Sequence, residues 1–236
     1  MNILDWIVLI LIAYMTLTGI YRGFIHSALS LGTFFFSWLS SFFFAPLMSR
    51  ALINNHTIYS FIFNFTEGRE RIVDFEDTKL LVSKLSENQI DNLVSQSNLP
   101  MPFNSLIKDN IIDQSFRSKG LTTLGQYYDI TISNAFINII AFLIVFIIAM
   151  TIFDFIVNAA NYTLKFPVLK RYDTTVGAFI GLLRGVFVTY ALFIITPLAL
   201  VLMPITQIYD LLYDSLYASF FYTTNFMLNI IKGIIV

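Results

Sequence analysis

The sequence predicts an all-α integral membrane protein in which four transmembrane helices form two hairpins. Three observations support this prediction. Of the 236 residues, 57% are hydrophobic and only 12% are charged, whereas a soluble domain carries about 25% charged residues. Several charge-free runs approach or exceed the ~20 apolar residues that cross a bilayer. The motif Gly-x-x-Arg-Gly occurs twice, at 19–23 and 181–185, each time beside such a run.

Residues 1–49 are predicted to form the first transmembrane hairpin. A first span covers 3–20 and a second charge-free run covers 24–49, so that Arg22 and Gly23 mark the corner between them. The start of the chain has no cationic region, and no small-x-small cleavage site precedes the corner. We therefore expect a retained helix and not a cleaved signal peptide.

Residues 50–129 are predicted to form a helical extracytoplasmic insert. They hold eight of the fourteen Lys and Arg residues and ten of the fifteen Asp and Glu residues. Apolar residues at helical spacing predict one helix over 67–97 and a second over 103–119, which Gly120 ends. Two helices of this size are expected to cap the membrane domain and not to fold alone.

Residues 130–203 are predicted to form the second transmembrane hairpin. Its first span, the third of the chain, is free of charge over 130–153. At 1.5 Å per residue this span measures about 36 Å, which is enough to cross the hydrocarbon core. Asp154 is therefore expected at the edge of the membrane.

The position of the fourth span depends on Arg184. If the embedded helix began at Val176, Arg184 would lie about 12 Å along it, at a cost of roughly 2.5–3.5 kcal/mol near the bilayer centre. A start at Gly185 gives an apolar run to Met203 of about 28 Å, which is long enough. We therefore predict that the embedded segment begins at Gly185 and that Arg184, like Arg22, marks a membrane surface.

Residues 204–236 are predicted to form a helix that lies in the membrane interface, with a fifth span as the alternative. Two aspartates and several polar residues interrupt the aromatic residues of this segment. The positive-inside rule assigns the short, cation-bearing connections to the cytoplasm. The N-terminus, the 50–129 insert and the C-terminus are then expected outside.

Glycines at four-residue spacing are the first candidate site residues. Glycine lets helix backbones approach closely in lipid, where burial of apolar surface no longer drives association. The predicted helix-packing residues are Gly19, Gly23, Gly177, Gly181 and Gly185.

Charged and polar residues in or near the spans are the second set of candidates. Ionisable groups there are functional candidates by default, so Arg22, Asp154 and Arg184 belong to this set. A structural ion pair or simple hydration at the membrane surface is the alternative for Asp154 and Arg184. Asn134 and Asn138 lie one turn apart, which fits either hydrogen bonds between helices or a polar path through the membrane.

We predict no catalytic residue, no metal site and no cofactor. The sequence contains no Gly-x-Ser-x-Gly, His-Glu-x-x-His or phosphate-binding Gly-x-x-x-x-Gly-Lys motif. Its two histidines, His26 and His56, lie in different contexts, and there is no cysteine. The net charge of −1 provides no basic field for nucleic acid.

The start of the chain and the glycine–arginine motifs together resemble the CvpA (colicin V production protein) family. The resemblance rests on Asp5-Trp6, on Gly19-x-x-Arg22-Gly23-Phe24 and on Gly177-x-x-x-Gly181-Leu-Leu-Arg184-Gly185. It implies a four-helix protein of the bacterial inner membrane, linked to toxin production or export. The 50–129 insert is longer than in compact members of that family.

These observations favour a non-enzymatic protein of the CvpA type that supports production or export of a colicin V-like toxin, or that acts as a membrane assembly or anchoring factor. The alternative is a small oligomeric transporter or channel with a polar path between its helices. The expected partners are the lipid bilayer and either further copies of the chain or other membrane proteins.

Overall fold

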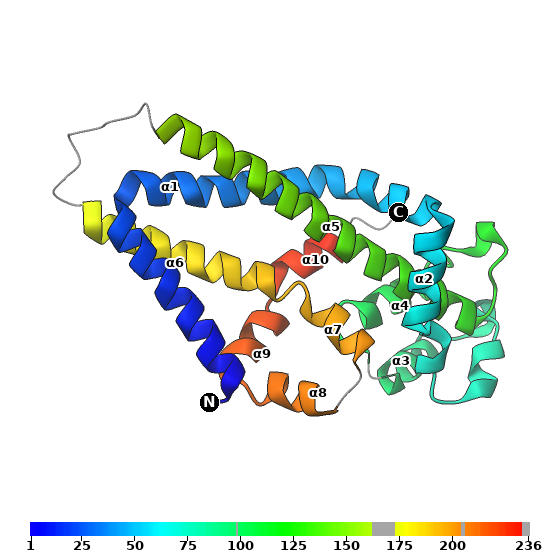
Figure 1. The fold of residues 1–236 in the computed structure, drawn as a ribbon. Coiled ribbons are helices and arrows are strands. Elements are labelled where there is room, and N and C mark those ends of the chain that lie inside the picture. The colour runs from blue at the N-terminus through cyan, green and yellow to red at the C-terminus, as the bar shows by residue number, and fades with distance from the viewer. Residues whose placement is uncertain (98, 162–172, 204–205, 233–236) are drawn as a thin grey trace. The chain divides into compact units, whose positions relative to one another are not determined.

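A computed structural model describes residues 1–97, 99–161, 173–203 and 206–232, and these residues are helical without any named strand (Figure 1). Three helical segments are long and apolar enough to cross a membrane. The segments are Ile3–Asn54, Leu124–Ala159 and Asp173–Leu202.

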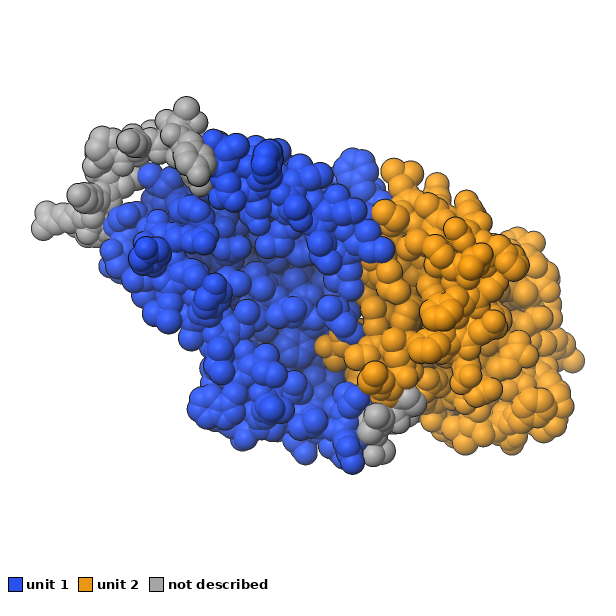
Figure 2. Space-filling model, viewed as in Figure 1, with its two compact units in different colours: residues 1–45, 142–195, 206–227 blue, residues 46–141, 196–205, 228–236 orange. Residues whose placement is uncertain are grey.

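The chain divides into two compact units, which Figure 2 shows in blue and orange. Unit 1 contains residues 1–45, 142–195 and 206–227, and unit 2 contains residues 46–141, 196–205 and 228–236.

Helix α1 (Ile3–Asn54) consists of two helical rods that meet at Gly23. Gly23 has φ 78° and ψ 179°, a conformation that glycine adopts at little cost because it has no Cβ. The chain changes direction there (Figure 1), at the position where the sequence separates the first two predicted spans. The first rod, residues 3–22, is about 30 Å long. The second rod continues to Asn54, beyond the predicted end at residue 49.

Helix α5 (Leu124–Asn161) is one continuous helix and extends beyond the predicted span at both ends. In unit 2, its residues 131–139 are buried on all sides, so this part forms the core of that unit. In unit 1, it presents an exposed apolar face. That face contains Ile147, Ile148, Ile152, Phe155 and Ile156.

The predicted fourth span, 185–203, is not one continuous helix, and the start of its embedded part at Gly185 stays a prediction. Helix α6 (Asp173–Leu192) starts earlier, and a turn separates it from helix α7 (Thr196–Leu202). Pro197 explains the turn: it has no N–H to donate to the carbonyl four residues before it, but it fits the first turn of a new helix. Arg184 therefore lies within α6 and does not precede its helix.

The insert is less helical than predicted. Over 67–97, the only α-helix is α3 (Glu87–Gln96), which follows three short 3-10 turns. The expected helix over 103–119 stops at Ile112 as α4 (Phe103–Ile112), and a 3-10 turn then ends at Gly120, which has φ 77°. A further helix, α2 (His56–Thr66), begins two residues after α1.

The insert packs around the first half of α5. Together with that helix it forms the core of unit 2, in which apolar side chains from α3, α4 and α5 are buried. Examples are Ile90, Phe103, Ile107, Ile111, Leu124 and Ile132.

The prediction of one continuous helix at the C-terminus is wrong, whereas its position in the membrane interface stays a prediction. The described part of this segment forms three short helices, α8 (Thr206–Tyr213), α9 (Leu216–Thr223) and α10 (Phe226–Lys232). The side chain of Ser215 accepts the N–H of Ala218, which caps a new helix at that position. In unit 1, α9 packs against both α8 and α6.

Candidate functional site

The first rod of α1 and helix α6 touch through glycine backbone. A Cβ placed on Gly19 would lie 2.9 Å from the Cα of Gly181, and a Cβ on Gly181 would lie 2.6 Å from the carbonyl oxygen of Met15. A Cβ on Gly177 would lie 2.5 Å from the carbonyl oxygen of Gly19. All three distances are shorter than van der Waals contact, so a side chain at any of these positions would separate the helices. We call Gly19, Gly177 and Gly181 the glycine contact.

The two other candidate glycines lie at the ends of this contact. A Cβ on Gly185 would lie 3.1 Å from the Cα of Ile12, so α6 is less tightly packed there. Gly23 lies at the corner of α1, where a Cβ would lie 2.7 Å from the carboxyl carbon of Asp173.

Asp173 fixes the corner. Its Oδ1 accepts the N–H of Phe24 at 2.6 Å, across 149 positions of sequence. Phe24 begins the second rod, so the carboxylate occupies the N-terminus of that helix, where a negative charge is favourable. This role of Asp173 was not predicted from the sequence. An aspartate at a helix start is a visible signal, but its partner on another helix is not.

The charged candidates lie together in unit 1, and we call Arg22, His26, Asp154 and Arg184 the charged cluster. The charge of Arg184 is attracted by Asp154 and repelled by Arg22, and His26 interacts with all three. Arg22 is exposed, whereas the other three side chains are partly buried. Asp154 and Arg184 do not form an ion pair within 4.0 Å, since the ion pairs of the described residues lie elsewhere.

Asn134 and Asn138 lie in unit 2. They are 5% and 3% exposed. The hydroxyl of Ser49 donates a hydrogen bond to Oδ1 of Asn138. Oδ1 of Asn134 and Nδ2 of Asn138, both described atoms, are buried without a hydrogen-bond partner. These amides belong to unit 2, whereas Asp154 and Arg184 belong to unit 1.

Asp5 is a buried carboxylate that the sequence analysis did not single out as a site. It is 0% exposed and accepts hydrogen bonds from the Ser215 hydroxyl at 2.6 Å and from the backbone N–H of Tyr217 at 2.8 Å. The N–H of Asn2 adds a third bond at 2.9 Å. A buried carboxylate with this many donors is a satisfied structural group.

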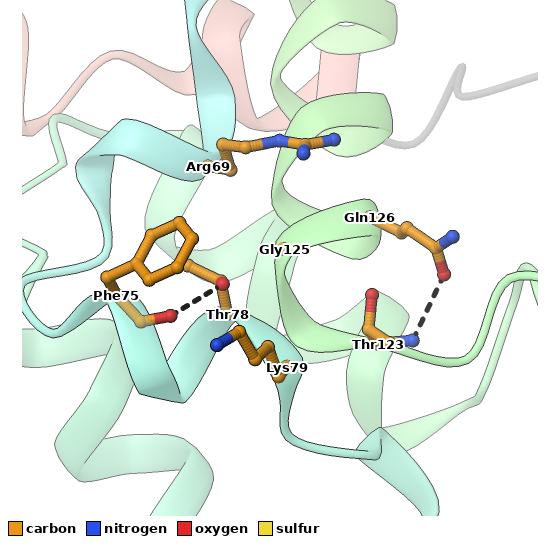
Figure 3. Close-up of a pocket in the computed structure, with 7 residues that line it drawn as sticks. All are labelled: Arg69, Phe75, Thr78, Lys79, Thr123, Gly125 and Gln126. Atoms are coloured by element: carbon orange, nitrogen blue, oxygen red, sulfur yellow. Dashed lines mark hydrogen bonds between the residues drawn. The ribbon is translucent and has the colours of Figure 1, made fainter.

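A pocket of about 320 Å³ opens in unit 2 beside the start of α5 (Figure 3). Arg69 at its rim is paired with Asp129, with an Nε–Oδ2 distance of 2.8 Å. The hydrogen bond and the charge of Asp129 raise the pKa of Arg69 above its ordinary value. Lys79 is paired with Glu76 at 2.9 Å. The described lining includes no histidine and no carboxylate, so it offers no general acid or base near neutral pH.

The described residues contain no group of three or more His, Cys, Asp or Glu side chains that could hold a metal ion.

Comparison with known proteins gives one match. A family model described as Colicin V production protein matches residues 4–66 and 112–225, which is more than half of the chain. The unmatched stretch between these two ranges, 67–111, falls inside the insert and contains α3 and most of α4. The comparisons with curated proteins and with solved structures found no match.

Proposed function

Because the chain belongs to the colicin V production protein family, we propose that it is a non-enzymatic membrane protein that supports the production or export of a colicin V-type toxin. Membership supports a role in colicin V production at the level of the family. The family and the long apolar helices also indicate a membrane protein. The more specific proposal is that the chain acts as an assembly or anchoring factor in the bacterial inner membrane.

The glycine contact is the observation that carries this proposal. It holds the first rod of α1 against α6 through backbone atoms, which suits a rigid support in lipid. The opposite face of the first rod is apolar and exposed, as a lipid-facing surface is. Its residues are Ile3, Ile7, Ile10, Tyr14, Leu17 and Tyr21.

The proposal includes four spans, with both termini and the insert outside. The two rods of α1 are each long enough to cross, and α5 and α6 supply the other two spans. Within unit 1, Asp5 binds Ser215 and Tyr217, which favours the start of α1 and the C-terminal helices on one side of the membrane.

Single cysteines test this topology, because the chain has none of its own. Ser95→Cys is expected to react with an impermeant thiol reagent in intact cells. Thr163→Cys, outside the described residues, is expected to react only after the membrane is opened. The reverse pattern would invert the proposed orientation.

Toxin release tests the function itself. In a host that carries a colicin V-type operon, deletion of this chain is expected to lower the toxin activity of the medium, and the full chain is expected to restore it. Unchanged release after deletion would contradict the proposal.

A transporter or channel is the second candidate, because Asn134 and Asn138 leave polar atoms unpaired in the core of unit 2. Such atoms are costly unless water or a solute binds them. Liposomes containing the purified chain separate the two functions. No solute flux is expected of an assembly factor, and flux that Asn134→Leu abolishes would favour the transporter.

A further inference from the structure

The charged cluster contains an arginine that lacks a partner. Nε of Arg184 is buried and has no hydrogen-bond partner among the described residues. The ion pairs among the described residues lie in unit 2 and are formed by Arg69, Lys79 and Lys108, so none of them involves Arg184. A guanidinium carries five donors in a planar fork that matches a phosphate or carboxylate. A buried donor of this kind is costly to leave unpaired, so an external anion is expected.

The charges of the cluster are unbalanced. Arg22 and Arg184 repel each other, and Asp154 is the anion that attracts Arg184. With His26 counted as neutral, and without Asp173, whose carboxylate caps the N-terminus of the second rod at Phe24, the four residues of the cluster have a net charge of one positive unit. The phosphodiester of an anionic phospholipid supplies a single negative charge, which balances the cluster.

The cluster lies at a depth that a lipid headgroup reaches. A Cβ on Gly177 would lie 2.9 Å from the carbonyl carbon of Gly23, so Gly177 is level with the corner of α1. If both rods of α1 cross the membrane, this corner lies at the membrane surface. Arg184 is seven positions further along α6, about 10 Å from the corner. Arginine side chains from such depths extend toward the interface.

The surroundings of the cluster suit a lipid more than a soluble anion. Arg22 is exposed at the corner, and the residues before it, Ile20 and Tyr21, are 39% and 90% exposed. Apolar surface beside a cation matches a ligand whose charged head is joined to acyl chains. We propose that the charged cluster binds the phosphodiester group of an anionic phospholipid. This binding is independent of the proposed role in toxin production.

Native mass spectrometry of the detergent-solubilised full chain tests the site, with short-chain phosphatidylglycerol as the probe. The wild type is expected to bind phosphatidylglycerol about tenfold more tightly than phosphatidylcholine, which corresponds to about 1.4 kcal/mol. Arg22→Gln and Arg184→Gln are each expected to abolish this preference. Arg50→Gln removes an exposed arginine of unit 2 and is expected to preserve it.

Asp154→Asn separates a lipid site from a structural pair. It removes the anion that competes for Arg184, so phosphatidylglycerol should bind several-fold more tightly. If the lipid phosphate does not contact Arg184, removal of Asp154 will not raise lipid affinity, and that result would overturn the proposal. Arg184→Lys keeps the charge but loses the fork; it is expected to bind with intermediate affinity and replaces Arg184→Gln if that variant does not fold.

Two other outcomes would also overturn the site. One is an unchanged preference for phosphatidylglycerol in both arginine variants, which would mean that the lipid adheres elsewhere. The other is displacement of phosphatidylglycerol by an equal concentration of inorganic phosphate, which would identify a free anion as the ligand.

Discussion

Gly181→Ala is the substitution that tests the glycine contact most directly. The added Cβ would lie 2.6 Å from the carbonyl oxygen of Met15, which is a backbone atom and cannot rotate away. Attractive contacts between heavy atoms have an optimum near 3.5–4.0 Å, so the helices must separate by about 1 Å. Such overpacking costs about 1–3 kcal/mol.

Gly32→Ala is the matched control. Gly32 lies in the second rod of α1, and a Cβ there would have no atom within 4 Å. Both substitutions replace glycine by alanine inside a helix, which favours the helix by about 1 kcal/mol. That contribution cancels in the comparison. The remaining difference between the variants is the cost of separating the helices, about 1–3 kcal/mol.

Reversible unfolding in mixed detergent micelles measures this difference. Gly181→Ala should be less stable than Gly32→Ala by the stated amount, and Gly32→Ala should be at least as stable as the wild type. Equal free energies of unfolding for the two variants would refute the reasoning. It would mean that α6 and the first rod do not approach through glycine in the membrane.

Three further predictions concern other described contacts. Asp173→Ala should destabilise unit 1 by about 1 kcal/mol, measured in the same unfolding assay, because it removes the cap of the second rod; no change would mean that the corner holds without it. Asp91→Asn should lower the pKa of Lys108, which Asp91 raises mainly through its hydrogen bond. A lysine whose pKa is raised in the folded state stabilises the fold at pH values below its unfolded pKa of about 10.4, and this contribution is lost as the pH rises through the folded pKa. The free energies of unfolding of wild type and variant should therefore differ at neutral pH and converge in strong alkali. If NMR gives the same titration curve for Lys108 in the wild type and in Asp91→Asn, the prediction is contradicted. Asn138→Leu should destabilise unit 2 by about 1–3 kcal/mol, because its partner Ser49 is left buried without a hydrogen bond. Asn134→Leu should be neutral or stabilising, because Oδ1 of Asn134 has no partner to lose. If Asn134→Leu is the more destabilising of the two, Asn134 binds a ligand.

The long helices could be predicted from sequence because their signals are local. A charge-free run and its length are enough to indicate α5 and the two rods of α1. The break at Gly23 follows from a glycine beside a charge. Their partners are not local: Asp173 lies 149 positions from the N–H that it caps, and one sequence gives no measure of that distance.

The errors have specific physical causes. In the insert, apolar residues recur at helical spacing over 67–97, but Glu67 adopts a left-handed conformation and the side chain of Asp74 accepts the N–H of Glu76, which favours turns. At the fourth span, the prediction rested on the cost of a buried Arg184 and on helix length, and it did not take account of Pro197, which lies in the first turn of a new helix. Periodicity reports which residues share a helix face, but not whether side chains offer the backbone other hydrogen bonds.

The bonds of Asp5 have a consequence for synthesis of the chain. The carboxylate is made 210 positions before its partner Ser215. At about 5–20 residues per second, this interval lasts roughly 10–40 s. During that time, the first rod carries a carboxylate whose final donors do not yet exist. A nascent chain that stops at residue 203 never supplies them, so translation must pass residue 217 before the N-terminal end of α1 reaches its native hydrogen bonding.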